Sequence, residues 1–378
     1  METLRLVDLV AFRERMLTIL KNLFLLTFPA VLFTFLLLEL IFRFVIPAAA
    51  PPHVYFDPSE QILRFDVNGP RSGTYTVGNL AQERGRWRIN NFGWNSEIDY
   101  HRDRSGKPRV AIIGDSYIES LQPDVEETMP GLLRQQIGDK VDVYSFGISS
   151  APMSQYLHMS RYVTRNFDPD ILVFNIVGND FEENLCEVGW LLGMMCLDDT
   201  GAQIKESEII PYSPSFARRW ARRSSLVRYM VLNLQLGTGA FEAVAGSRKL
   251  NVAPVGSAPA PLDRRRVENA IDYLLRTIAE ENSERSVIFI MDGPRRTLYG
   301  ETSPELDETA PWKNSLLREI TIKYEFRYID LTNEFRRKYE QDGKKFNSEQ
   351  DYHWNKYGHS VVAGALLRTL EEMNTVSK

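Results

Sequence analysis

The sequence predicts an α/β fold in which a doubly wound parallel sheet of five strands follows one N-terminal transmembrane helix. The first observation is an alternation of short apolar runs with longer amphipathic segments from Arg109 onward, the pattern of strand–helix–strand units. The second is that the apolar runs are continuous, as in strands covered on both faces. The third is the charge-free segment 22–38, which is rich in Leu and Phe.

Composition excludes several classes of function. The chain has 378 residues, of which 43% are hydrophobic and 25% charged, as in ordinary globular proteins. A formal net charge of −5 lacks the basic excess typical of nucleic-acid-binding proteins. The two cysteines, Cys186 and Cys196, form neither a disulfide scaffold nor a CxxC zinc pattern. We therefore expect no nucleic-acid partner, no metal and no cofactor.

Residues 23–46 form the predicted transmembrane helix. At about 1.5 Å per residue this helix spans roughly 36 Å, enough to cross a hydrocarbon core of about 30 Å. Pro29 is tolerated near the start of the span, and Glu39 and Arg43 lie one turn apart near its far end, where they can pair. The excess of basic residues on the first flank puts the N-terminus in the cytoplasm and the rest outside; these residues are Arg5, Arg13, Arg15 and Lys21.

Two other interpretations of the apolar segment remain open. A cleaved signal peptide would use Ala48-Ala49-Ala50 as its cleavage site. A buried core helix is the other alternative. We favour a retained anchor, because the apolar run is too long and the preceding polar region too extended for a signal peptide.

The predicted organisation has four parts. They are a cytoplasmic segment 1–21, an anchor 22–46, a linker and irregular lead-in segment 47–105, and a hydrolase-like domain 106–378 with an insertion at about 182–261. Within the domain the apolar runs predict strands at 110–113, 141–146, 171–177, 287–291 and 327–331. Amphipathic spacing predicts helices at 125–137, 153–166, 264–281, 305–323 and 357–373, and an Arg-rich helix at 218–232 in the insertion.

Polar residues and glycines follow the first three predicted strands. Gly114-Asp115-Ser116 ends the first, Gly147 the second, and Asn179-Asp180 the third. Because parallel strands bring ligands to their carboxyl ends, a hydroxyl, a glycine N–H and an asparagine amide are expected at one edge. Acyl transfer requires such donors around a developing oxyanion. Each of these segments alone is an ordinary turn, so the hypothesis depends on the presence of all three at the same edge of the sheet.

The predicted base is His353, which precedes the last helix. A loop at this position can direct the imidazole across the sheet edge toward Ser116. Asp351, two residues earlier, can accept a hydrogen bond from the ring and hold its tautomer. His359 is interpreted as structural. The sequence therefore predicts a triad of Ser116, His353 and Asp351.

These residues resemble the four motif blocks of the SGNH (GDSL-type) hydrolases. The blocks are Gly114-Asp115-Ser116, Gly147, Asn179-Asp180 and the D-x-H-W-N-x-x-G-H run that begins at Asp351, and the match covers 109–378 apart from 182–261. The resemblance implies a flavodoxin-like SGNH fold, with Ser116 as nucleophile, His353 as base and Asp351 as its partner. It also implies an oxyanion hole made of the Ser116 and Gly147 N–H groups and the Asn179 side chain.

The sequence departs from the common SGNH pattern at two positions. The acid usually stands three residues before the histidine, where this chain has Gln350, and a glycine usually precedes the asparagine by two, where it has Val177. The D-x-H-W form looks like a membrane-anchored bacterial subgroup associated with acetylation and deacetylation of envelope polysaccharides. That resemblance implies a single-pass inner-membrane protein with its catalytic domain in the periplasm or outside the cell.

The predicted function is a membrane-anchored serine esterase, deacetylase or O-acyltransferase acting on O-acyl esters of envelope carbohydrate. The expected partners are an acylated small molecule or polysaccharide, the inner membrane and the envelope polysaccharide machinery. The alternatives are a non-catalytic, membrane-anchored carbohydrate-binding or assembly module, and an esterase directed at lipids.

Three further features have open interpretations. The arginines at 218, 219, 222 and 223 could contact anionic lipid or form a solvated helix face. Cys186 and Cys196 could form a disulfide in an oxidising compartment or be small buried residues. Arg295-Arg296, after the fourth strand, could contact an anionic substrate or pair with nearby acids.

Overall fold

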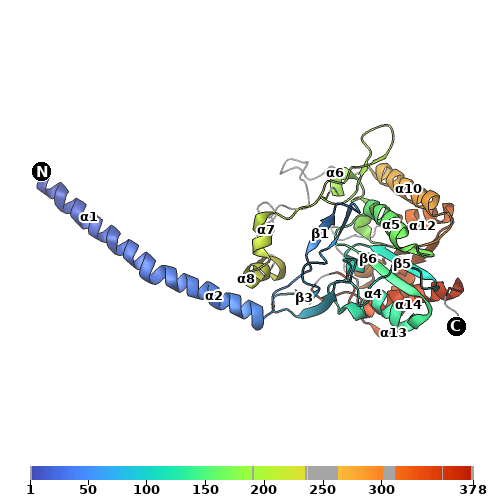
Figure 1. Ribbon diagram of the computed structural model, residues 1–378, viewed down its shortest axis with the longest axis horizontal. Helices are drawn as coiled ribbons and strands as arrows, with labels where there is room; N and C mark the ends of the chain where they lie inside the picture. The colour runs from blue at the N-terminus through green and yellow to red at the C-terminus, as the bar shows by residue number, and fades with distance from the viewer. Residues whose placement is uncertain are drawn as a thin grey trace.

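A long N-terminal helix leads into an α/β domain in the computed structural model (Figure 1). The structure describes residues 2–189, 191–234, 236, 263–300, 311–350 and 352–375. The central sheet consists of β5 (Arg109–Gly114), β6 (Asp142–Gly147), β7 (Ile171–Ile176), β10 (Ser286–Met291) and β11 (Arg327–Asp330). Its five strands are parallel and follow the order β11-β10-β7-β5-β6. This is the flavodoxin-like order and confirms the predicted fold class.

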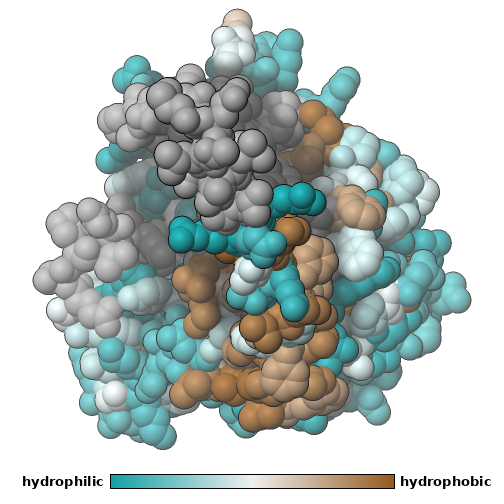
Figure 2. Space-filling model, turned by 90° about the vertical axis from the view of Figure 1, so that its left-hand side faces the viewer, coloured by the Kyte–Doolittle hydropathy of each residue, from teal (hydrophilic) through white to brown (hydrophobic). Residues whose placement is uncertain are grey.

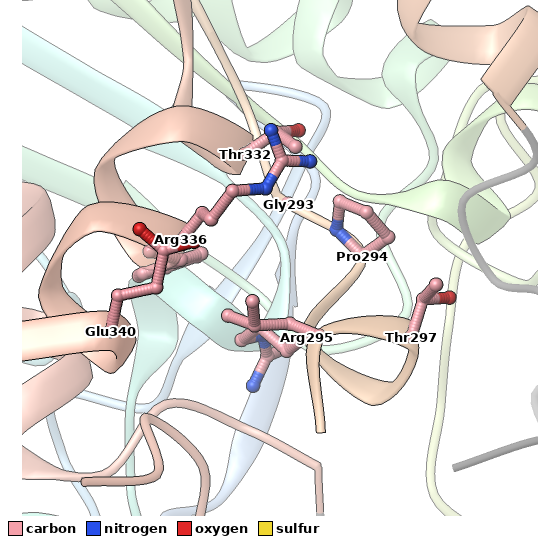
Figure 3. Close-up of a pocket in the computed structure, with 9 residues that line it drawn as sticks. Gly293, Pro294, Arg295, Thr297, Thr332, Arg336 and Glu340 are labelled. Atoms are coloured by element: carbon pink, nitrogen blue, oxygen red, sulfur yellow. The ribbon is translucent and has the colours of Figure 1, made fainter. Parts of the chain in front are cut away.

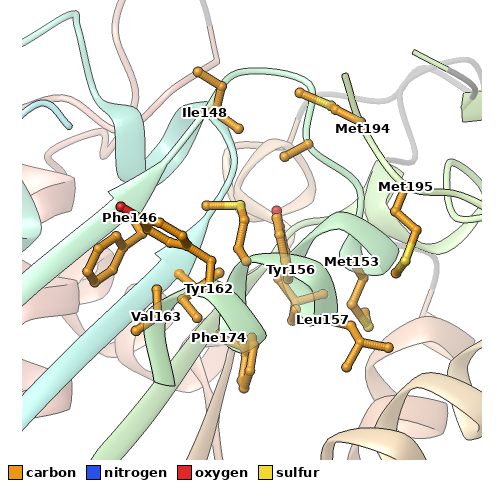
Figure 4. Packing of buried hydrophobic residues seen from close by; sticks show 14 of the residues in the cluster. Phe146, Ile148, Met153, Tyr156, Leu157, Tyr162, Val163, Phe174, Met194 and Met195 are labelled. Carbon is orange, nitrogen blue, oxygen red and sulfur yellow. The ribbon is translucent and has the colours of Figure 1, made fainter. Parts of the chain in front are cut away.

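Helices cover both faces of the sheet, so each strand divides its side chains between two cores. One face packs against α5 (Met153–Phe167), α10 (Arg264–Glu281) and α12 (Pro311–Lys323), and Figure 4 shows Phe146 and Phe174 in that cluster. The opposite face packs against α4 (Met129–Ile137), α13 (Leu331–Asp342) and α14 (Lys356–Glu372). Burial on both sides explains the continuous apolar runs from which the strands were predicted.

The helices outside the insertion differ from the prediction at two places. The segment predicted as one helix at 125–137 is a 3-10 turn, η2 (Val125–Glu127), followed by α4, because Pro130 lacks an N–H and fits only the first turn of a helix. The side chain of Thr128 caps α4 by accepting a hydrogen bond from the Gly131 N–H. Helix α13 was not predicted. It starts directly at the end of β11, with Asp330 as its N-cap.

The lead-in segment forms two antiparallel hairpins, which pair β1 (Val54–Asp57) with β2 (Ile62–Phe65) and β3 (Ser72–Val77) with β4 (Glu83–Arg88). Residues that follow them cover the edge strand β6. The Tyr100 hydroxyl accepts from the Ser145 N–H (2.8 Å) and donates to the Ser145 carbonyl (3.0 Å), and Trp94 packs edge-on against Phe146. Covering an edge strand in this way removes its exposed pairing groups.

The insertion contains short elements rather than one Arg-rich helix. These are α6 (Cys186–Gly189), the pair β8 (Leu197–Asp198) and β9 (Lys205–Glu206), α7 (Phe216–Ala221), α8 (Ser225–Arg228) and the π-turn η5 (Tyr229–Asn233). The predicted helix at 218–232 is interrupted at Ser224, whose hydroxyl caps α8 by accepting from the Val227 N–H. Cys186 and Cys196 form a disulfide.

The N-terminal helix comprises α1 (Glu2–Asn22), the π-turn η1 (Leu23–Thr27) and α2 (Phe28–Phe44). The wider turn comes immediately before Pro29, whose ring would otherwise clash with the carbonyl four residues earlier. The stretch Phe12–Phe44 of this helix comprises 33 residues and has a mean hydropathy of 2.3, so it is long and apolar enough to cross a membrane. The most apolar part of this stretch is not buried in the molecule. The helix ends at Phe44, two residues before the predicted end of the span.

Candidate active site

Ser116 stands at the turn from β5 into the short helix α3 (Ser116–Glu119). Asp115 is the N-cap of α3, and its carboxylate accepts a hydrogen bond from the Tyr117 N–H at 2.9 Å. This cap fixes the backbone on both sides of Ser116. The serine itself is half-buried.

Gly147 lets α3 pack against the end of β6. A Cβ at this position would lie 2.1 Å from the Glu119 nitrogen, a distance that no side chain tolerates. The Ile148 N–H donates to the Gly114 carbonyl at 3.3 Å.

His353 meets Ser116 although the two are separated by 237 positions. The His353 Nε2 and Ser116 Oγ atoms lie 2.8 Å apart, within hydrogen-bonding distance. The loop that carries the histidine is closed by two backbone hydrogen bonds, from Ser348 N–H to the His353 carbonyl (2.9 Å) and from Asn355 N–H to the Phe346 carbonyl (2.8 Å). Asn355 then caps α14 by accepting from the Gly358 N–H.

Of the other predicted site residues, the structure describes Gly147 and Asn179 but not Asp351. Asp351 lies outside the described residues, so its pairing with His353 stays a prediction. Asn179 follows β7, next to β5 in the sheet, and is exposed. Its amide nitrogen donates to the Glu183 carboxylate at 2.9 Å. Gly147, Ser116 and Asn179 therefore stand at the ends of three adjacent strands, β6, β5 and β7, as predicted.

A buried arginine, Arg295, holds the loop that carries His353 through hydrogen bonds. The Arg295 guanidinium donates to the Tyr352 carbonyl (2.7 Å) and to the Tyr117 hydroxyl (2.7 Å), and the Tyr117 hydroxyl donates to the same carbonyl (3.0 Å). The Tyr117 ring also packs 4.9 Å from the His353 ring. The residue after the nucleophile, Tyr117, is thus hydrogen-bonded directly to the residue before the base, Tyr352.

Asp292 completes this support. Its carboxylate forms an ion pair with Arg295 at 2.9 Å and accepts from the Trp354 indole nitrogen at 3.1 Å. Both charged side chains are only 6% exposed. Of the two interpretations of Arg295 from the sequence, ion pairing is the one the structure shows. The Asp292-x-x-Arg295 spacing immediately after β10 is the signal that could have identified the pair.

Arg296 contacts the same loop differently. Its guanidinium carbon lies 3.1 Å from the centroid of the Tyr352 ring, which is 39% exposed. A cation stacked on the residue next to His353 places positive charge at the rim of the site.

His359 has a structural role in the fold. Its Nδ1 accepts a hydrogen bond from the Met129 N–H at 3.1 Å, at the start of α4, and burial lowers its pKa to about 3. Among the residues that the structure describes, no three His, Cys, Asp or Glu side chains gather in a way that could hold a metal ion.

Two carboxyl groups next to predicted site residues are buried, since Asp115 directly precedes Ser116 and Asp180 directly follows Asn179. Burial raises the pKa of Asp115 to about 6, and it raises the pKa of Asp180 well above its ordinary value, with the Asp115 charge acting in the same direction. Asp180 accepts hydrogen bonds from the Tyr156 hydroxyl (3.1 Å) and the Val177 N–H (2.9 Å). Burial therefore favours the protonated, uncharged form of both carboxyl groups.

Asp115→Asn is expected to stabilise the protein at neutral pH. The native state keeps the Asp115 proton up to about pH 6, whereas the unfolded chain loses it near 3.8, so the free energy of unfolding falls as pH rises between these values. Asparagine removes this loss and can still accept from the Tyr117 N–H. Urea unfolding in detergent should show a gain of up to about 3 kcal/mol above pH 6 that shrinks toward zero below about pH 4. An equal gain at both pH values would contradict this assignment.

A separate cavity of about 230 Å³ lies between α11 (Arg295–Leu298) and α13. Its lining includes Pro294, Thr297, Thr332, Arg336 and Glu340 (Figure 3). Arg295 contributes to the wall while its guanidinium bonds to Tyr352 and Tyr117. Neither Ser116 nor His353 lines this cavity.

Comparison with known proteins finds similarity only at the level of folds. No family model matches the sequence, and no curated protein matches it. One similar solved structure is LAE5, an α/β hydrolase enzyme from the metagenome of Lake Arreo, Spain, with 14% identity over 73% of this chain and 99% of that chain and a TM-score of 0.41. A member of the lipolytic protein G-D-S-L family from Veillonella parvula DSM 2008 shares 11% identity over 70% of this chain and 98% of that chain, with a TM-score of 0.40.

An acetyl xylan esterase, AlAXEase, shares 13% identity over 69% of this chain and 99% of that chain, with a TM-score of 0.40. Similarity at these identities and TM-scores does not bear on the reaction. This chain is an α/β protein with a flavodoxin-like five-stranded parallel sheet, preceded by one long apolar helix.

Proposed function

We propose that this protein is a membrane-anchored serine hydrolase or O-acyltransferase acting on O-acyl esters. The observation that supports this proposal is the 2.8 Å distance between Ser116 Oγ and His353 Nε2, two atoms on segments 237 positions apart. A hydroxyl within hydrogen-bonding distance of an imidazole is the arrangement of an activated nucleophile.

The proposed reaction proceeds through an acyl-enzyme. Ser116 Oγ attacks the ester carbonyl carbon while its proton passes to His353 Nε2. The tetrahedral intermediate collapses, the bond to the leaving oxygen breaks, and His353 returns the proton to that alkoxide. Water or a sugar hydroxyl then attacks the acyl-Ser116 carbonyl, with His353 taking its proton, and the Ser116 oxygen leaves as a hydroxyl once it has been reprotonated.

The oxyanion of the intermediate would be bound by the N–H groups of Ser116 and Gly147 and by the Asn179 amide. The position of these residues at three adjacent strand ends supports this role. The hydrogen bond from Asn179 to Glu183 orients the amide and uses one of its two N–H protons, which leaves the second for substrate. Asp351 is proposed to hold the tautomer of His353.

The apolar helix is proposed to be a retained anchor of the inner membrane, with the N-terminus in the cytoplasm and the domain in the periplasm or outside. Ala48 and Ala49, the candidate cleavage site, are buried, and the Ala49 N–H donates to the Asn233 side chain at 2.9 Å. These contacts join the end of the helix to the folded domain, which supports its retention. The disulfide Cys186–Cys196 supports an oxidising compartment.

We further propose acylated envelope carbohydrate as the substrate, with the envelope polysaccharide machinery as the setting. The decisive experiment incubates the detergent-solubilised full chain with a fluorophosphonate probe and with an acetylated model ester, with and without a carbohydrate acceptor. The proposal expects covalent labelling of Ser116 and release of acetate or its transfer to the sugar. Transfer exceeding release would identify an O-acyltransferase, and release alone an esterase. A folded protein with neither labelling nor turnover would favour the non-catalytic carbohydrate-binding module instead.

A further inference from the structure

The end of the apolar helix is built into the insertion. Glu39, on α2, accepts hydrogen bonds from the N–H groups of Ser225 and Leu226 and from the Ser224 hydroxyl, each at 2.9 Å. A carboxylate in this position caps the start of α8. The membrane helix therefore supplies a cap that the insertion's own residues provide only in part, through Ser224.

Two more contacts join the same elements. Arg43 donates to Glu39 at 2.7 Å, which confirms their predicted pairing, and also to the Arg223 carbonyl at 3.2 Å, between α7 and α8. The Phe42 and Tyr229 rings stack with centroids 3.7 Å apart. Helix α8 is consequently held beside the last turns of α2, and α7 precedes α8 in the chain (Figure 1).

Charge along the helix indicates the depth of this junction. The uncharged segment between Lys21 and Glu39 comprises 17 residues. As a helix it spans about 26 Å, close to the thickness of a hydrocarbon core of about 30 Å. Glu39 would thus lie at the outer boundary of the bilayer, and α8 and α7 at the level of the headgroups.

The side chains that α7 exposes suit that level. Phe216 and Trp220 are 68% and 58% exposed, and their ring centroids lie 6.2 Å apart. Arg219 on α7 and Arg223, two residues after its end, are also exposed, and the Arg223 guanidinium lies 5.6 Å from the centroid of the Trp220 ring. Figure 2 views the molecule from the side of the long helix and shows apolar residues in the lower middle of the view, where this helix points toward the viewer.

We infer that α7 is a membrane-interface platform that recognises anionic phospholipid. Phe216 and Trp220 insert at headgroup level, where aromatic rings are favoured, and Arg219 and Arg223 bind the phosphates. Together with the Glu39 cap, the platform fixes the orientation of the domain on the bilayer. This inference rests on the proposed anchoring and is independent of the ester chemistry.

The test measures whether Trp220 contacts lipid in the full chain. The protein and its Trp220→Phe variant are reconstituted into phosphatidylcholine vesicles containing lipids brominated near the headgroup, which quench nearby tryptophan fluorescence. Trp87, Trp94 and Trp354 are buried, so they contribute little to such quenching. We expect the wild type to be quenched substantially more than Trp220→Phe.

A second comparison tests the arginines. Adding phosphatidylglycerol should increase Trp220 quenching, and the double variant Arg219→Glu/Arg223→Glu should abolish that increase. The matched control is Arg265→Glu/Arg276→Glu, the same change of charge at exposed positions of α10, far from α2 in Figure 1. This control should behave as the wild type, and near-UV circular dichroism checks that each variant is folded.

Several outcomes would overturn the platform. Extraction of the vesicles with alkaline carbonate tests the anchor separately. If the protein stays in the membrane during this extraction but the wild type and Trp220→Phe are quenched equally, the anchor is retained and α7 is not a membrane-interface platform. Cross-linking of a residue at position 220 to a second copy of the chain, without lipid quenching, would assign the surface to dimerisation. Release of the intact protein by carbonate would remove the anchor and the platform together, whatever the result with ester substrates.

Discussion

Ser116→Ala is expected to lower kcat/KM for an acetylated ester by about 10⁴-fold or more, since loss of the nucleophile leaves only binding and the oxyanion donors. The change removes the one atom that lies 2.8 Å from His353 Nε2. Its effect on the free energy of unfolding should be small, because a half-buried hydroxyl is replaced by hydrogen and the backbone is held by the Asp115 cap. Initial rates with the purified full chain, and circular dichroism of the same sample, measure both quantities.

The serine and the histidine should act as one unit. His353→Ala alone is expected to cost nearly as much as Ser116→Ala, and the double variant little more than either, because each removes the same step. His101→Ala is the matched control, since His101 is exposed and has no contact with Ser116. Additive losses in the double variant, or a normal rate in Ser116→Ala, would contradict the assignment of the nucleophile.

Arg295→Met is expected to lower the free energy of unfolding by about 3–5 kcal/mol, more than the other substitutions proposed above, because it leaves the Asp292 carboxylate buried without its counter-ion. Asp292 is 6% exposed and would retain hydrogen bonds from the Trp354 indole and the Gly293 N–H. The substitution also removes one of the two donors to the Tyr352 carbonyl, one residue before His353, and leaves only the Tyr117 hydroxyl. Urea unfolding in detergent measures the loss, and the ester assay should show reduced activity.

Two controls separate the charge effect from packing. In Asp292→Asn/Arg295→Met no unpaired charge remains, so part of the lost stability should return. Arg296→Met should cost much less, since Arg296 stacks on Tyr352 and forms none of the ion pairs found in the described part of the chain. If Arg295→Met costs no more than Arg296→Met, the buried pair does not stabilise the site as inferred.

Local sequence pattern predicted most of the domain because local physics decides it. Burial on both faces requires continuous apolar runs, and all five strands were predicted to within one residue at each end. Helix α10 was predicted with its observed bounds because its apolar residues recur at helical spacing, from Val267 to Ile278. Gly114-Asp115-Ser116 and Gly147 were identifiable because tight turns and close approaches restrict the residue types that fit.

Prediction failed where a short element depended on its surroundings. Helix α13 follows β11 without an intervening loop and buries only Leu331 and Phe335, so the boundary between strand and helix left little trace in the pattern. The Arg-rich segment was predicted as one helix because its spacing is helical. The capping of α8 by Ser224 and Glu39 divides it, and Glu39 lies 185 positions before Ser224.

The sequence by itself determined the parallel sheet, the strand ends that carry Ser116, Gly147 and Asn179, and the apolar helix before them. Only the tertiary structure decided that His353 reaches Ser116, that Asp292 and Arg295 hold the loop between them, and that Glu39 joins the helix to the insertion. The physical reason is that periodicity records which face of an element is buried. It carries no record of which distant side chain completes a hydrogen bond or an ion pair.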